Sequence, residues 1–207
     1  MTTEPTPQES LWAGDFGREY AQRNRGDDLV ASNLALFERV LSRTEGVSSV
    51  LELGCNIGNN LRALRTLLPD ASLRGVEINA DAAAEVAAWG GAEVDVASII
   101  GYAAPETVDL AFTKGVLIHI NPDRLQEVYS SLTSASSRYV MVCEYYNPSP
   151  VEVHYRGLDH ALFKRDFAGE ILDATPGLRL VDYGFTYHRD PVHPLDDSTW
   201  FLMERVA

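Results

Sequence analysis

The 207-residue sequence is poor in cysteine and contains no long apolar run. Its two cysteines, Cys55 and Cys143, do not fit the Cys-x-x-Cys or Cys/His spacings that hold zinc. A framework of disulfides is therefore excluded, and we expect a cytoplasmic protein. No uncharged stretch reaches the roughly 18 apolar residues of a membrane helix, and the polar start MTTEPTPQES lacks the basic and apolar regions of a signal peptide. We expect no membrane partner.

Basic side chains are also scarce. Lys and Arg number 17 against 30 Asp and Glu, a formal net charge of −13. Nucleic acids are bound by clustered cations, so nucleic acid is disfavoured as a partner. The short basic groups at 23–25 and 164–165 suit a small anion better. His154 and His160 lack the carboxylate or cysteine that would complete a metal site, and no metal is expected.

Short apolar runs alternate with helical stretches through the first two thirds of the chain. This order predicts an α/β domain with a mostly parallel sheet. The expected strands cover 47–53, 73–78, 92–96, 108–113 and 138–145. The expected helices cover 59–68, 81–89 and 122–135, and a later one ends near residue 173. Strand-like runs at 178–187 and 198–206, separated by a Pro- and Asp-rich loop, predict a terminal hairpin.

Two further segments flank this alternating part. Residues 1–10 are expected to be flexible and 11–207 to form one domain, of which 11–46 is a helical lid preceding the first strand. A polar, aromatic insertion at 146–165 follows the last parallel strand. Long connections of this kind often carry function, so we expect the insertion to lie on the substrate side.

A glycine-containing turn joins the first expected strand to its helix. Glu52 and Gly54 lie at the strand end, and the turn continues through Asn56 to Gly58. Such a turn brings backbone N–H groups and a helix N-terminus to a ligand above the strand ends. Asn56 stands at the second glycine position of the G-x-G-x-x-G pattern, where a pyrophosphate needs the closest backbone approach. This difference argues against NAD.

Acidic residues end the second and third expected strands. Glu77 follows Gly58 by about 20 residues, where a carboxylate can accept hydrogen bonds from the two hydroxyls of a ribose. Asp95 can accept one from the exocyclic amine of adenine, with Ile78 and Ile99 flanking the ring. Both an adenosine-bearing methyl donor and NAD fit this pattern. The alternatives are a helix cap or surface acid for Glu77 and turn chemistry for Asp95.

Three segments, LELGCNIGNNLRALRTLLP, GVEINADAA and VDLAFTKGVLIHINPD, together resemble the class I S-adenosylmethionine-dependent methyltransferases. More narrowly, FTKGVLIHINPD, CEYYNPSPVEVHYRG, LFKRDFAGEILD and LVDYGFTYHRDP resemble the pseudaminic acid biosynthesis-associated methylases, which are related to the modification of nonulosonic acid sugars. The resemblance spans nearly the whole chain from Trp12. It implies a Rossmann-like α/β fold: a seven-stranded, mostly parallel sheet with an antiparallel last strand and helices on both faces.

The resemblance also implies a site for S-adenosylmethionine. The turn with Gly54 and Asn56 is expected to contact the methionine moiety, Glu77 the ribose, and Asp95 with Val96 the adenine. The segment 114–117 is expected to face the sulfonium. In the N-terminal lid, Arg23 or Asn24 is expected to reach the donor's carboxylate. The expected donor-binding residues are Tyr20, Arg23, Glu52, Gly54, Asn56, Glu77, Ile78, Asp95, Val96, Lys114, Gly115 and Val116.

Methyl transfer requires the nucleophile to be held in line with the methyl group and, for a hydroxyl, to be deprotonated. His119 is a candidate general base, with a hydrogen-bonded core histidine as the alternative. Tyr146 is a second catalytic candidate. Arg156 can clamp a carboxylate or form a surface ion pair. The expected acceptor-binding residues are Phe16, Tyr145, His154, Tyr155, Arg156, Lys164, His188 and Arg189.

These expectations favour a methyltransferase that modifies oxygen or nitrogen on a small polar or acidic metabolite, such as a nonulosonic acid sugar or another biosynthetic intermediate. A non-catalytic protein that binds S-adenosylmethionine as a sensor or assembly partner is the alternative from a different class. An NAD-dependent oxidoreductase is disfavoured by Asn56. A monomer and a homodimer are both compatible with the sequence.

Overall fold

The centre of the molecule is a seven-stranded sheet with the strand order β3-β2-β1-β4-β5-β9-β8, and the computed structural model describes residues 4–206. Strand β9 pairs antiparallel with both of its neighbours, and the other pairings are parallel. This confirms the predicted sheet. The strands are β1 (Ser49–Leu53), β2 (Ser72–Glu77), β3 (Glu93–Val96), β4 (Val108–Lys114), β5 (Ser136–Glu144), β8 (Leu178–Phe185) and β9 (Thr199–Arg205).

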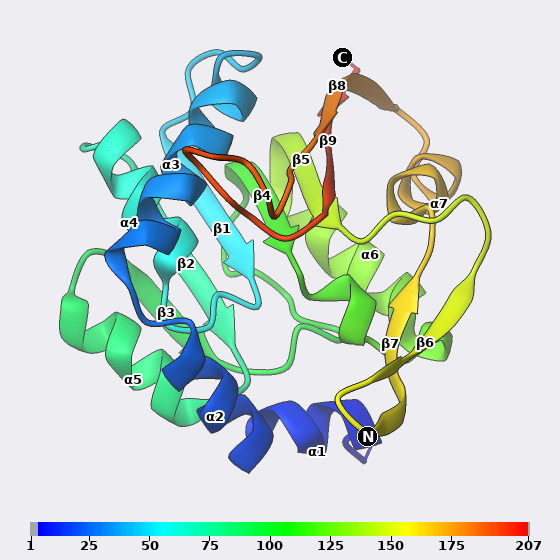
Figure 1. Ribbon diagram of the computed structural model, residues 1–207. Helices are drawn as coiled ribbons and strands as arrows, with labels where there is room; N and C mark the ends of the chain where they lie inside the picture. The colour runs from blue at the N-terminus through cyan, green and yellow to red at the C-terminus, as the bar shows by residue number, and fades with distance from the viewer. Residues whose placement is uncertain (1–3, 207) are drawn as a thin grey trace.

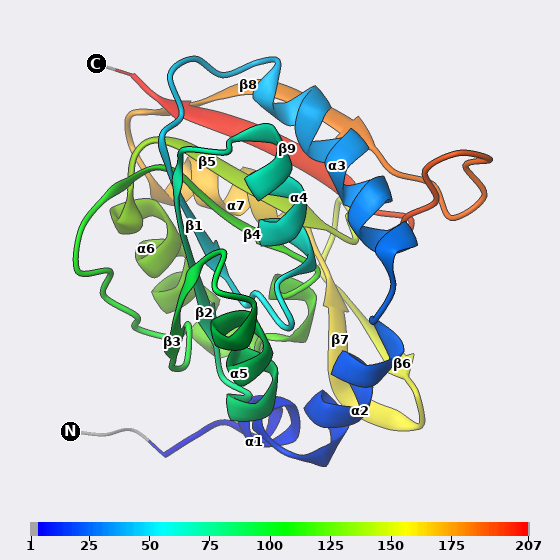
Figure 2. The same cartoon turned by 90° about the vertical axis from the view of Figure 1, so that its left-hand side faces the viewer.

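Helices cover both faces of the sheet, as predicted (Figures 1 and 2). One layer holds α3 (Asp27–Leu41), α4 (Asn59–Leu67) and α5 (Ala80–Trp89), and the other holds α6 (Leu125–Ala135) and α7 (Phe167–Ala174). Successive strand side chains point to opposite faces, so Leu110 and Phe112 of β4 join the core under α3 and α4 while Ala111 joins the core under α6. Burial on both faces explains the almost continuous apolar runs of these strands.

Two short helices, α1 (Pro7–Ala13) and α2 (Asp15–Arg23), lie along the edge where the parallel strands end (Figure 1). Helix α1 begins before the predicted start at residue 11, so that prediction was wrong. Thr6 and Glu9 form a reciprocal capping box and Pro7 opens the first turn, which together fix the helix start. Of the segment predicted to be flexible, residues 1–3 lie outside the described residues.

The 146–165 insertion contains a separate two-stranded antiparallel sheet, β6 (Val151–Tyr155) and β7 (Leu158–Lys164). Its turn residues Arg156 and Gly157 both have positive φ, 50° and 84°. Two such residues are typical of the type I′ turns that close tight hairpins, but Asn or Asp is the usual residue before the glycine. The sequence analysis missed the hairpin because arginine occupies that position.

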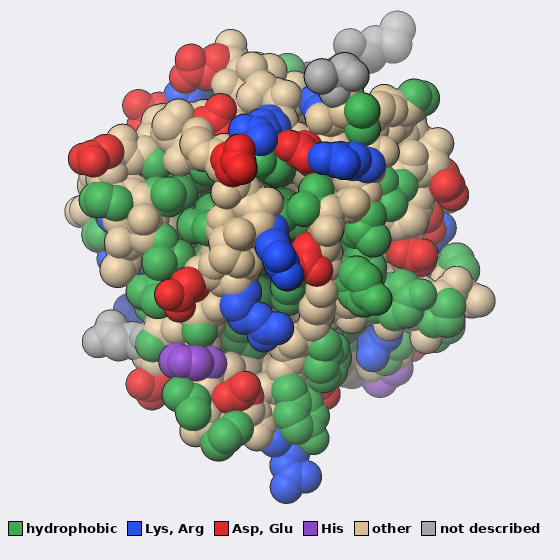
Figure 3. All heavy atoms as spheres, turned by 90° about the horizontal axis from the view of Figure 1, so that it is seen from above, with side chains coloured by type: hydrophobic (Ala, Val, Ile, Leu, Met, Phe, Trp, Pro, Cys, Tyr) green, Lys and Arg blue, Asp and Glu red, His purple; other side chains and the backbone are tan. Residues whose placement is uncertain are grey.

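The hairpin and the N-terminal helices lie side by side at the strand-end edge (Figures 1 and 2). Gln8 of α1 donates a hydrogen bond from Nε2 to the His160 carbonyl of β7, at 2.9 Å. The opposite end of the sheet, where the parallel strands begin, carries interspersed acidic and basic side chains (Figure 3). Within residues 4–206, no helix has the length and apolar character needed to cross a membrane.

Candidate active site

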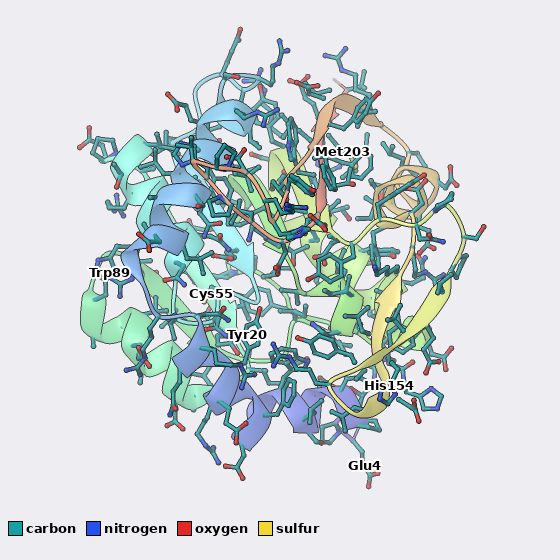
Figure 4. The ribbon with its side chains drawn as sticks, viewed as in Figure 1. Glu4, Tyr20, Cys55, Trp89, His154 and Met203 are labelled. Atoms are coloured by element: carbon teal, nitrogen blue, oxygen red, sulfur yellow. The ribbon has the colours of Figure 1, made fainter. Side chains whose placement is uncertain are left out.

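A cavity of about 390 Å³ opens where β1, β2 and β4 end, beneath α1 and α2. Its volume lies in the range of pockets for small molecules and cofactors. Tyr20 of α2 and Cys55 of the turn after β1, both labelled in Figure 4, are two of its lining residues. The predicted site residues that line the cavity are Tyr20, Gly54, Asn56, Glu77, Ile78, Lys114, Gly115, Val116, His119 and His188.

The turn after β1 lies tightly against its neighbours. The N–H groups of Gly54 and Cys55 both donate to the Val76 carbonyl, at 2.8 and 3.0 Å. Gly54 has φ +82°, and a Cβ there would lie 2.6 Å from a methyl carbon of Val116. Asn56 has φ 48°, a left-handed conformation that asparagine tolerates better than most residues. This tolerance explains how asparagine can occupy the second glycine position.

Glu77 is buried at the base of the cavity. Its two carboxylate oxygens accept separate backbone hydrogen bonds, Oε2 from Asn56 at 2.7 Å and Oε1 from Asn79 at 2.8 Å. Burial raises the pKa of Glu77, although these backbone bonds oppose the shift. Each oxygen retains a second lone-pair site for a ligand hydroxyl. Asn79, not Glu77, caps α5, so the helix-cap and surface alternatives for Glu77 are wrong.

Asp95, the acidic residue of β3, is bonded to two side chains of the protein. Asp95 accepts a hydrogen bond from the Tyr102 hydroxyl at 2.5 Å and pairs with Arg74 at 3.5 Å. Neither Asp95 nor the exposed Val96 lines the cavity, and their contact with adenine stays a prediction. Both partners, Arg74 and Tyr102, contact the same oxygen of the carboxylate, Oδ2.

Four further lining residues lie at this end of the cavity, and of these the sequence analysis selected only Ile99, as a flank of the adenine ring. Ser98 and Ile99 follow β3, and Gln8 and Glu9 belong to α1. The Ser98 hydroxyl donates to Glu9 Oε1 at 2.5 Å and so joins the two segments.

Glu52 lies beneath the cavity, fully buried between β1 and the α3–α4 layer. Its Oε1 accepts a hydrogen bond from Asn60 Nδ2 at 2.5 Å, while Oε2 has no partner among the described residues. Burial raises the pKa of Glu52 to about 8, opposed by the Asn60 bond and by the charge of Lys114. The side-chain oxygens of Asn33 and Asn60 are likewise buried without a donor.

The segment after β4 is positioned by a carboxylate that sequence analysis missed. Glu144, buried at the end of β5, accepts hydrogen bonds from the N–H groups of Val116 at 3.0 Å, Leu117 at 3.1 Å and Ile118 at 3.5 Å. Burial raises the pKa of Glu144 to about 7, with the three N–H groups opposing the shift. Glu144 thereby fixes the short helix η1 (Leu117–His119), which carries His119. The only sequence signal for Glu144 was an isolated acidic residue at the end of an apolar strand.

His119 lines the cavity but is itself buried. Its Nδ1 lies 2.7 Å from the Ala161 carbonyl, which can only accept, so Nδ1 carries the proton and Nε2 the lone pair. Burial lowers the pKa of His119 to about 4. The imidazole is therefore neutral near pH 7, and both the base and the core-histidine interpretations fit this geometry.

Aromatic side chains join the lid helices to the β6–β7 hairpin around His119. The Trp12 ring lies 4.7 Å from the His119 ring and 5.0 Å from the Tyr20 ring, centroid to centroid. The Tyr155 ring lies 5.2 Å from His119 and 6.5 Å from Phe16. The structure thus brings together the two segments that were expected to cover the acceptor, although Phe16 and Tyr155 lie behind the cavity wall.

Several predicted residues lie away from the cavity. Tyr146 is 42% exposed and packs near Phe201, so its predicted position at the reacting centre is wrong. His154 pairs with Asp159 at 2.8 Å on the exposed hairpin, and Figure 4 shows it far from Cys55. The predicted residues outside the lining are Phe16, Arg23, Glu52, Asp95, Val96, Tyr145, Tyr146, His154, Tyr155, Arg156, Lys164 and Arg189.

The remaining predicted side chains have partners of their own. Arg23 lies 3.8 Å from Glu19, and Arg156 donates to the Tyr155 hydroxyl at 3.1 Å. Lys164 Nζ lies 5.2 Å from the Tyr145 ring centroid. Across residues 4–206, no three His, Cys, Asp or Glu side chains gather as metal ligands.

The architecture is shared with solved methyltransferase structures. Magnesium protoporphyrin IX methyltransferase from Synechocystis with bound S-adenosylmethionine has a TM-score of 0.68 and 16% identity, over 99% of this chain and 100% of that one. The plantazolicin methyltransferase BpumL with S-adenosylhomocysteine has a TM-score of 0.67 and 11% identity, over 97% and 94%. The chain has a Rossmann-like methyltransferase fold.

A third similar structure is the sugar N-methyltransferase KedS8 from a Streptoalloteichus species, with a TM-score of 0.66 and 15% identity over 94% of each chain. No protein-family model matches the sequence, and the search of curated proteins finds no match. These structural similarities, all below 20% identity, establish the fold.

Proposed function

We propose that this protein transfers the methyl group of S-adenosylmethionine to a hydroxyl or amine of a small polar metabolite. The observation that carries the proposal is Glu77, a buried carboxylate held by Asn56 and Asn79 at the base of a 390 Å³ cavity in a methyltransferase fold. Two oxygens fixed in this way can accept the two hydroxyls of a ribose.

The cavity residues divide between the parts of the donor. The turn at Gly54 and Asn56 would hold the methionine moiety, Glu77 the ribose, and the wall at Lys114 to Val116 the sulfonium region. When bound, S-adenosylmethionine supplies an electrophilic methyl group. What the protein contributes is a preorganised wall, because Glu144 fixes the backbone of this segment through three hydrogen bonds.

The acceptor would lie next to His119 and beneath the lid. His119 Nε2 is unprotonated near neutral pH, so it can accept the proton that a hydroxyl or amine releases. His188 and Asp196 from the β8–β9 loop line the cavity as further polar contacts. The resemblance to pseudaminic acid-associated methylases supports a nonulosonic acid sugar or another biosynthetic intermediate as acceptor, and KedS8 with its sugar N-methyltransferase activity is a structural neighbour.

Calorimetric titration with S-adenosylhomocysteine, S-adenosylmethionine and NAD tests the donor assignment. The proposal predicts micromolar binding of the first two and at least about 100-fold weaker binding in Glu77→Ala, since two hydrogen bonds to a buried carboxyl group are lost. Asp70→Ala removes an exposed carboxylate just before β2 and should leave both affinities unchanged. Binding of NAD with no binding of S-adenosylhomocysteine would contradict the proposal.

The low pKa of His119 favours one second candidate, a non-catalytic protein that binds S-adenosylmethionine as a sensor or assembly partner. A screen of amino sugars, acidic sugars and amino acids for methyl transfer separates the two functions. The enzyme should show turnover that His119→Ala lowers more strongly than it lowers donor affinity. A sensor should bind S-adenosylmethionine with an affinity that His119→Ala leaves unchanged, and it should methylate none of these compounds.

A further inference from the structure

Gln8 is an unusual side chain because one end of its amide is fixed and the other has no partner. It is only 8% exposed and lines the cavity from α1. Its Nε2 donates to the His160 carbonyl at 2.9 Å, whereas its Oε1 is buried without a donor among the described residues. A buried acceptor without a donor is costly, so an occupant of the cavity that supplies an N–H group would stabilise this arrangement.

The carboxylate of the neighbouring Glu9 already has donors. Glu9 Oε2 accepts the Thr6 N–H at 2.7 Å, and Oε1 accepts the Ser98 hydroxyl at 2.5 Å. Asp95, the acid that the sequence suggested for this role, is held by Tyr102 and Arg74 outside the cavity. Because Glu9 is bonded to Ser98, Gln8 lies at the same end of the cavity as the segment after β3.

We propose that Gln8 Oε1 accepts a hydrogen bond from the exocyclic N6 amine of the donor's adenine ring and makes the site selective for adenosyl over inosyl ligands. The inference rests on the proposed function, because it places the donor's base at the Gln8 end of the cavity and its ribose on Glu77. In an inosyl ligand a carbonyl oxygen replaces the amine, and two acceptors would then face each other.

The His160 carbonyl fixes the orientation of the Gln8 amide on which this selectivity depends. A free glutamine could rotate its amide and present Nε2 to the carbonyl of an inosyl ligand. Here rotation would place Oε1 against the His160 oxygen and lose the 2.9 Å bond. The β6–β7 hairpin therefore fixes which end of the Gln8 amide the ligand meets, and the lid contributes to donor recognition.

Titrations with S-adenosylhomocysteine and S-inosylhomocysteine test the inference by calorimetry. The unmodified protein should bind the adenosyl ligand at least about 10-fold more tightly than the inosyl ligand. Gln8→Met, which keeps the length of the side chain but not its polar atoms, should weaken adenosyl binding about 10-fold and abolish the preference. Asp95→Asn, the matched control at the sequence-predicted position, should keep both affinities. The ratio of two affinities on one variant does not depend on the folded fraction.

The outcomes separate the inference from the proposed function. If the unmodified protein binds neither ligand, the donor assignment itself is overturned. If it binds S-adenosylhomocysteine and Gln8→Met or Gln8→Leu retains the adenosyl preference, only the role of Gln8 is overturned. Loss of the preference in Asp95→Asn instead would return recognition of the base to Asp95.

Discussion

The two halves of the cavity are assembled in different ways. The strand-end half comprises the turn 54–58, Glu77 and the segment 114–119, and it is held by hydrogen bonds between neighbouring strand ends, from backbone N–H groups to backbone carbonyls and to the carboxylates of Glu77 and Glu144. The lid half comprises α1, α2 and the β6–β7 hairpin, and it is held by side chains from distant parts of the chain. The Asn56–Glu77 bond spans 21 residues in sequence, whereas the Gln8–His160 bond spans 152.

Because of this difference, we expect the strand-end half to determine the stability of the domain and the lid half to determine ligand selectivity. Groups in the strand-end half are buried in the sheet and its helix layers, so changes there should alter the free energy of unfolding of the whole domain. The lid half packs on the site through aromatic contacts and side-chain hydrogen bonds such as those of Gln8, Ser98 and Asn79, so changes there should act mainly on ligand binding and on His119. The following variants break or sharpen this contrast.

Glu144→Ala should have the largest effect. The substitution leaves the N–H groups of Val116, Leu117 and Ile118 without their acceptor in a buried environment, and we expect a loss of about 3 kcal/mol in the free energy of unfolding. Urea denaturation measures it. Glu144→Gln retains an acceptor oxygen and should lose less. A Glu144→Ala variant as stable as the unmodified protein would show that η1 does not depend on this carboxylate.

Gly54→Ala should have the next largest effect. A Cβ at this position would meet the Val116 side chain at 2.6 Å and force alanine into φ +82°. We expect a loss of about 2 kcal/mol from the combined strain. Val116→Ala added to Gly54→Ala should recover part of the loss, because it removes the close contact and leaves only the backbone strain. Equal stabilities of the single and double variants would exclude the packing component.

Glu52, buried beneath the strand-end half, makes the stability of the domain depend on pH. Its folded pKa of about 8 lies above its ordinary value of 4.5, so the folded state binds more protons than the unfolded state between these values. Its contribution to stability is therefore complete below pH 4.5 and lost as the pH rises through 8. Glu52→Gln should flatten this part of the profile of melting temperature against pH. A profile unchanged by the substitution would contradict the burial argument.

Trp12→Ala, in the lid half, should change global stability least. The Trp12 ring covers the His119 ring at 4.7 Å, so its removal should admit water and raise the His119 pKa from about 4 towards its ordinary 6.5. The imidazole proton signals, followed by NMR across pH 3 to 8, report this shift. Trp89→Ala, on the far end of α5, is the control and should leave the His119 titration unchanged. An unmoved His119 pKa in Trp12→Ala would mean that the lid does not bury the histidine.

The sheet and the strand-end half could be predicted from the sequence because their determinants are local. Buried parallel strands are continuous apolar runs, and the turn with Gly54 and the acid at Glu77 have fixed spacing. Gln8 and Glu144 could not be found in the same way. Gln8 bonds to the carbonyl of His160, and Glu144 accepts from N–H groups that begin at Val116. These partners are distant in sequence, and no pattern near Gln8 or Glu144 identifies them.

The departures from the predicted positions have the same origin. Asp95 has the expected type and position for a contact with adenine, but it does not line the cavity, and Tyr102 and Arg74 both contact its Oδ2. Tyr146 follows the end of β5 closely, yet it lies near Phe201 on the surface. The spacing of residues predicts the element on which a side chain lies, whereas its partners are set by tertiary contacts.

A crystal structure of the protein with S-adenosylhomocysteine tests the central claim most directly. The account predicts ligand density in the cavity beneath α1 and α2, with both ribose hydroxyls within hydrogen-bond distance of the Glu77 carboxylate and the N6 amine at Gln8 Oε1. Density for the ligand elsewhere, or a ribose bound away from Glu77, would contradict the assignment of this cavity as the methyl-donor site.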